Sequence, residues 1–96
     1  MNPYSLNKQP AQVAQELAQR LAVLRKQEGF SQAELARRSG VSLGSLRRFE
    51  QSGKISLESL LLLSQMLGRL DEFERVLLPG EDLRKIERLF DRKPGP

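Results

Sequence analysis

The segment that decides the fold of this 96-residue chain is residues 31–54, SQAELARRSGVSLGSLRRFEQSGK. Ser31 and Glu34 fit a capping box, in which the serine hydroxyl accepts a hydrogen bond from the third helical amide and the glutamate side chain reaches back. This first helix should stop at Gly40, and Ser42 is placed to cap the next one. The segment therefore predicts two short helices joined by almost no linker.

The corner between these helices has the residues that a sharp turn needs. Gly40 permits a positive φ, which lets the second helix leave the first at a steep angle. Ala36 is small where the two helices approach, and Val41 and Leu46 can close the corner from inside. Such a helix-turn-helix turns the start of its second helix outward, where it can enter the major groove of DNA. We therefore predict a helix-turn-helix at residues 31–51.

Positive charge is concentrated on this motif. Residues 31–54 hold five of the basic residues and two of the acidic ones, a local excess of three in a chain whose net charge is +4. Residues 71–82 are negatively charged instead, with acidic residues at five positions and Arg75 as the one basic residue. A positive field centred on the motif is what phosphate binding requires. The basic residues of the motif segment are Arg37, Arg38, Arg47, Arg48 and Lys54.

The rest of the chain also follows helical patterns. No segment alternates as a half-buried strand would, and every break between segments carries a glycine or a proline. We therefore predict an all-α fold of five or six short helices around one core. Apolar residues recur at helical spacing in the segments 11–28, 57–67, 70–78 and 81–92.

Three of these helices have an expected inner face. In segment 11–28 the apolar residues form one stripe, and Arg25 falls largely on the polar side. Segment 57–67 is apolar on more than one side, from Leu57 to Leu67, so it should be the central core helix. Segment 70–78 should turn three residues inward, which are Leu70, Phe73 and Leu77.

The chain divides into three parts. Residues 1–9 should be a flexible arm, residues 10–79 the helix-turn-helix domain, and residues 80–96 a C-terminal helix with a frayed tail. The last helix either caps its own core or joins an interface with a second copy or another partner. The apolar residues proposed for such an interface are Leu70, Phe73, Leu77, Leu83, Ile86, Leu89 and Phe90.

Composition excludes several classes of function. The chain has no histidine and no cysteine, which removes the commonest general base, the commonest metal ligand and any thiolate site. We therefore predict no enzyme, no metal and no cofactor, and read Asp71, Glu72 and Glu74 as a solvated helix start. The N-terminus lacks the apolar core of a signal peptide, and the longest apolar run, Leu60 to Leu63, is far too short to cross a membrane. A cytoplasmic location is the expectation.

The motif resembles the Xre-type helix-turn-helix family, which includes the lambdoid phage repressors and Cro. The resemblance extends from about Leu21 to Gly68 and implies a lambda-repressor-like fold. It departs at one point, since Gln51 and Ser52 both separate Glu50 from Gly53 where the family usually has one residue. The residues that carry it are Ser31-Gln32-Ala33-Glu34-Leu35-Ala36, Gly40-Val41-Ser42, Leu46, Arg48, Phe49, Glu50 and Gly53.

The resemblance also implies roles for the exposed residues. Leu43, Gly44 and Arg48 would occupy base-reading positions, with Arg47 next to them. Glu50 is interpreted separately as a structural residue that pairs with a nearby arginine or caps an amide. Phosphate contacts would come from Gln32 at the start of the first motif helix and from Ser42, Ser45, Arg37, Arg38 and Lys54. Arg37 and Arg38 are equally well read as a solvated face.

The sequence thus leads to one main hypothesis and two alternatives. The main one is a dimeric transcriptional regulator, a repressor, that binds double-stranded DNA at an inverted-repeat operator. The first alternative is an antitoxin of the HipB-like kind, which binds its own operator and also a kinase toxin. The second is a protein-interaction module that has kept the fold without binding DNA.

Overall fold

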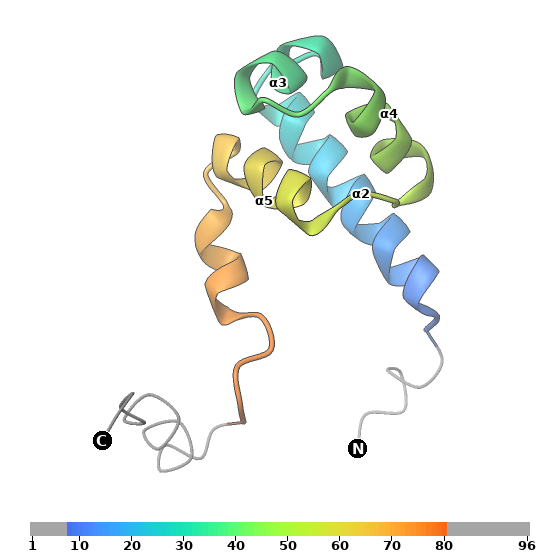
Figure 1. Cartoon of the computed structure of the whole chain (residues 1–96), viewed down its shortest axis with the longest axis vertical. Helices are drawn as coiled ribbons and strands as arrows, with labels where there is room; N and C mark the ends of the chain where they lie inside the picture. The colour runs from blue at the N-terminus through green and yellow to red at the C-terminus, as the bar shows by residue number, and fades with distance from the viewer. Residues whose placement is uncertain (1–7, 81–96) are drawn as a thin grey trace, which may run out of the picture.

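The computed structural model describes residues 8–80, and every regular element within them is a helix (Figure 1). The all-α prediction is therefore confirmed. The expected arm at 1–9, apart from its last two residues, and the helix at 81–92 with Leu83, Ile86, Leu89 and Phe90 lie outside the described residues. The elements are α2 (Pro10–Gln27), α3 (Gln32–Ser39), α4 (Leu43–Ser52), α5 (Leu57–Met66) and the 3-10 helix η1 (Leu70–Arg75).

The long helix α2 begins and ends as its sequence predicts. Pro10 occupies the first turn, where its missing amide costs nothing, and Gly29 follows the end with a φ of 79°. Its core-facing stripe consists of Ala18, Leu21 and, against expectation, Arg25.

The corner of the motif has the expected geometry. The Ser31 hydroxyl accepts a hydrogen bond from the Glu34 amide at 3.0 Å, and the Ser42 hydroxyl accepts one from the Ser45 amide at 3.1 Å. Gly40 ends α3 in the left-handed region with a φ of 81°. Only the second half of the predicted capping box is wrong, because the Glu34 carboxylate turns away from the helix start and pairs with arginines of the same helix.

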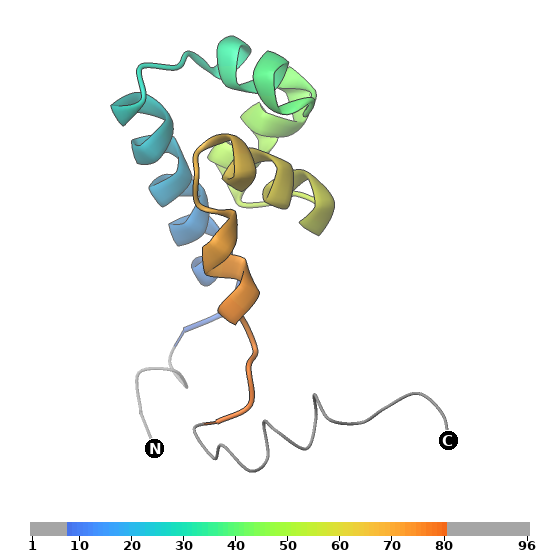
Figure 2. The same cartoon turned by 90° about the vertical axis from the view of Figure 1, so that its left-hand side faces the viewer.

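The core lies where α2, α3, α4 and α5 meet. Helix α4 packs against α2, and α3 packs against both α4 and α5, as Figures 1 and 2 show from two sides. Leu35, Leu46, Phe49 and Leu63 are the largest fully buried side chains, with Val41 sealing the corner as predicted. Because Leu46 and Phe49 are both locked inside, the orientation of α4 is fixed by packing.

At the end of α4 the backbone comes very close to α2. Gly53 caps the helix with a φ of 80° and lies against the first half of α2. A Cβ atom at this position would lie 2.8 Å from the carbonyl carbon of Ala14 and 2.9 Å from the amide nitrogen of Gln15. The contact requires glycine, and it holds the C-terminal end of α4 tightly against α2.

Helix α5 is less buried than the sequence predicts. Leu63 and Ser64 are its only buried residues, whereas Leu57 is 66% exposed and Met66 also faces solvent. The prediction that Leu57 to Leu67 belong to the core is therefore wrong for Leu57, Leu62 and Met66, whereas Leu60 and Leu67 are half-buried and pack against the core. No helix among residues 8–80 is both long enough and apolar enough to cross a membrane.

The predicted helix over 70–78 ends early. The 3-10 helix η1 stops at Arg75, Val76 is extended, and Leu77 adopts a φ of 63°. Leu77 is therefore not inward, as expected, but 95% exposed. Pro79 offers a physical reason, since a proline disfavours the helical region for the residue before it. Residues 76–80 run away from the helical body in both views (Figures 1 and 2).

Candidate nucleic-acid interface

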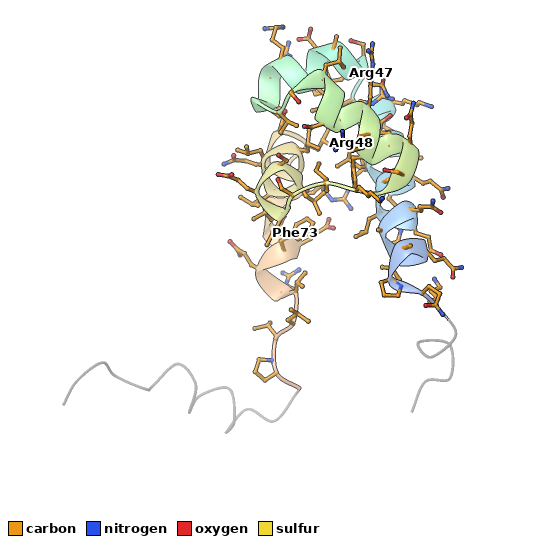
Figure 3. The ribbon with its side chains drawn as sticks, turned by 45° about the vertical axis from the view of Figure 1, so that its right-hand side comes forward. Arg47, Arg48 and Phe73 are labelled. Carbon is orange, nitrogen blue, oxygen red and sulfur yellow. The ribbon has the colours of Figure 1, made fainter. Side chains whose placement is uncertain are left out.

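The exposed side of α4 carries two arginines that have no ionic partner in the described part of the chain. Arg47 and Arg48 follow Leu46 and precede Phe49, so burial of those two apolar residues turns both arginines outward. Neither arginine forms a salt bridge with any residue between 8 and 80. Figure 3 shows both on α4, well separated from Phe73 on η1. Two unpaired guanidinium groups on an outer helix face can bind phosphates or base edges.

The N-terminal end of α4 is open and polar. The Ser42 hydroxyl donates to the Ser45 hydroxyl at 2.8 Å, which places two hydroxyl groups beside the free amides of the first turn. Gly44 is exposed in this turn, and a Cβ atom there would meet nothing within 4 Å. A helix start with free amides and no obstructing side chain suits close approach of an anion.

Leu43 differs from the other proposed base-reading residues. It is half-buried and packs against the core, whereas Gly44, Arg47 and Arg48 are exposed. Part of its side chain therefore supports the fold, and the remaining part is available at the surface for an apolar contact.

Gln32 is held in place by a buried ion pair. Its Nε2 atom donates to Glu50 Oε1 at 2.8 Å, and the Glu50 carboxylate accepts two further bonds from Arg25, at 2.7 Å from Nε and 3.1 Å from Nη2. Arg25 also donates to the carbonyl oxygen of Phe30 at 2.8 Å. This network, which we call the Arg25–Glu50–Gln32 network, joins α2, the 28–31 turn, α3 and α4. The expectation that Glu50 pairs with an arginine is confirmed.

Arg25 is buried, although the sequence pattern predicts it on the polar side of its helix. Only 7% of this residue is exposed. Arg25 follows Leu21 by four residues and so continues the buried stripe of α2, which was the available signal. A guanidinium has five N–H donors, and burying it is tolerated when these donors find acceptors. Every buried side-chain nitrogen and oxygen in residues 8–80, including those of Arg25, has a hydrogen-bond partner.

Arg37 and Arg38 face solvent on α3, but a single carboxylate neutralises them in part. Both donate to Glu34 Oε2. The hydrogen bond from Arg38 is the main reason that the pKa of Glu34 lies below its ordinary value, and the charge of Arg37 adds to it. The Arg38 guanidinium also lies 5.1 Å from the centre of the Phe30 ring, a cation–π distance. These two arginines are thus less available to an anion than Arg47 and Arg48.

Lys54 lies just beyond the C-cap of α4. It is exposed, and its amide donates to the Ser52 hydroxyl at 3.3 Å. The extra residue between Glu50 and Gly53 does not disrupt the motif, because Gly53 still forms the C-cap of α4 with a left-handed backbone conformation. Lys54 therefore follows α4 directly.

Comparison with known proteins agrees with this geometry. Residues 21–73, more than half of the chain, match the model of a helix-turn-helix family. No curated protein matches the chain. The matched range includes α3, α4 and α5, and with them the exposed arginines and the Arg25–Glu50–Gln32 network.

Proposed function

The chain belongs to the Xre-type, lambda-repressor-like helix-turn-helix family of DNA-binding regulators, and we propose that it is a repressor that binds an inverted-repeat operator as a homodimer. The observation that carries the proposal is the pair Arg47 and Arg48, exposed on α4 and unpaired within residues 8–80. We place the protein in the cytoplasm, where such an operator would be found.

Sequence reading is assigned to the outer face of α4. Arg47 and Arg48 can each donate two hydrogen bonds to guanine O6 and N7, which discriminates by ~1–3 kcal/mol against a wrong base. Gly44 leaves room for a base edge or the sugar–phosphate chain to approach the helix. The exposed part of Leu43 can contact a thymine methyl group.

Phosphate binding is assigned to residues that surround this face. A glutamine amide has two N–H donors, so Gln32 can keep its bond to Glu50 and offer the second hydrogen to a phosphate oxygen. Ser42, Ser45 and Lys54 would add contacts near the two ends of α4. Arg37 and Arg38 come second, because Glu34 already neutralises part of their charge.

The dimer follows from the size of the reading surface. One short helix reaches too few base pairs for tight selective binding, and two copies related by a two-fold axis read half-sites one helical turn apart. A palindromic operator is the DNA counterpart of that symmetry.

The test is a salt-titrated binding measurement on the DNA upstream of the gene. Arg48→Ala should lose selectivity for this DNA over random sequence by roughly 5- to 150-fold, the equivalent of one bidentate contact. Arg75→Ala is the matched control, because Arg75 is an exposed arginine on η1 outside the motif. Weak binding that is equal on random DNA and indifferent to Arg48 would refute the proposal.

A further inference from the structure

The segment Val76–Leu78 exposes three consecutive aliphatic side chains. Val76 is 55% exposed, Leu77 95% and Leu78 49%. Leu77 is also the one residue other than glycine with a positive φ among residues 8–80. Nothing within residues 8–80 compensates for this conformation or this exposure, which favours a contact with a partner beyond these residues.

An apolar groove begins where this segment leaves the body. It runs between α2 and η1, and Leu17, Phe73 and Val76 line its outer end. Leu21, Leu24 and Leu60 continue it inward, and Val23 and Arg20 lie along the α2 side. The groove and the exposed segment therefore share Val76 and form one largely apolar surface, which the Arg69–Glu72 ion pair borders.

We propose that two copies of the chain join by reciprocal insertion, with Leu77 of each copy seated in the α2–η1 groove of the other. The inference rests on the homodimer of the proposed function and names its interface. Within residues 8–80 the groove is not filled by Leu77 of the same chain, because residues 76–80 run away from the body and Leu77 is almost fully exposed (Figures 1 and 2).

A second copy fits this surface better than an unrelated partner does. A two-fold interface needs a patch that is complementary to itself, and this surface holds a projecting segment beside a recess of the same apolar character. The charges are complementary as well. Arg20 borders the groove on α2, and Asp71 and Glu74 on η1 are exposed, with none of the three in an ion pair within residues 8–80.

The groove is also compatible with bound DNA. Figure 3 shows Phe73 on η1, well separated from Arg47 and Arg48 on α4. A copy seated in the groove therefore leaves the exposed side of α4 free.

The experiment is sedimentation equilibrium of the full chain and of Leu77→Asn. Asparagine tolerates the left-handed region and removes the apolar side chain, so the fold of each subunit is kept. The dimer dissociation constant should rise about 100-fold or more, because each dimer loses two buried leucines. Val23→Asp, an exposed change on the groove side, should also weaken the dimer. Leu57→Asn, at an exposed leucine outside the groove, should leave the constant unchanged.

Several results would overturn the inference. One is a wild-type chain that stays monomeric at about 100 μM, a concentration at which a dimer with a dissociation constant of about 1 μM would be almost fully formed. Another is a dimer that is indifferent to Leu77→Asn but lost in the double variant Ile86→Asn, Leu89→Asn, which would place the interface in residues 81–96. The proposed function is tested separately. A monomer that still reads the operator refutes only the interface, and a Leu77-dependent dimer that ignores DNA refutes only the regulator.

Discussion

Replacing Gly53 by alanine tests whether the close approach of α4 to α2 is essential to the fold. Two costs add at this position. Holding alanine in the left-handed region costs ~1–2 kcal/mol. The new Cβ would also meet the backbone of Ala14 and Gln15 at 2.8 and 2.9 Å, and these atoms cannot rotate away as a side chain can. Overpacking of this kind costs typically ~1–3 kcal/mol. Together they predict a loss of ~2–5 kcal/mol in the free energy of unfolding.

Gly40→Ala separates the two costs. Gly40 caps α3 with a φ of 81°, almost identical to the 80° of Gly53, but a Cβ atom there meets nothing within 4 Å. It should therefore lose only ~1–2 kcal/mol. Urea unfolding followed by circular dichroism gives both values, and the Tm of Gly53→Ala should fall about 5–20 °C further than that of Gly40→Ala. Equal losses in the two variants would refute the reasoning, since they would mean that α2 moves aside at no cost.

Three further changes test the site. Arg25→Met should destabilise the fold by ~3–5 kcal/mol, because it leaves the Glu50 carboxylate buried without its ionic partner. Adding a second change, Glu50→Leu, should restore much of the lost free energy of unfolding, as measured by urea unfolding. A double variant that is no more stable than Arg25→Met would contradict this account. Glu34 has a lowered pKa in the folded chain, so its stabilising effect is complete above its unfolded pKa and disappears as pH falls through the lower folded value. Glu34→Gln should therefore shrink the stability difference between pH 7 and pH 3, and an unchanged difference would exclude this role. Gly44→Ala should keep or slightly raise the Tm, since its Cβ enters open space, yet weaken operator binding in a mobility-shift titration; unchanged binding would mean that DNA does not approach there.

Local signals in the sequence predicted the motif well. The caps at Ser31 and Ser42 and the turn at Gly40 depend on residues within one helical turn, so their geometry is encoded next to them. Inward positions such as Leu46 and Phe49 follow from helical spacing alone.

Features set by distant partners could not be predicted in this way. The spacing of Arg25 from Leu21 indicates its burial, but the partner that makes this burial possible, Glu50, lies 25 residues later, and no local pattern identifies such a pair. A helix with leucines on several sides does not reveal which side its neighbours cover, and so Leu57 was expected inside. Leu77 is predicted to face inward but is exposed for a related reason. The helical spacing of apolar residues continues to Leu77, although the backbone has already left the helix there.

The Arg25–Glu50–Gln32 network has a consequence for the thermodynamics of recognition. A long polar side chain on a helix surface samples many rotamers, and ordering one at an interface costs ~0.5–1.5 kcal/mol of entropy. The bond to Glu50 already restricts Gln32 in the free protein. The phosphate that we assign to Gln32 would then meet an amide that is preorganised, so the entropic cost of ordering it has been incurred during folding and not at the moment of binding. The buried Arg25–Glu50 pair would in this way contribute to DNA affinity, because it orders Gln32 before DNA binds.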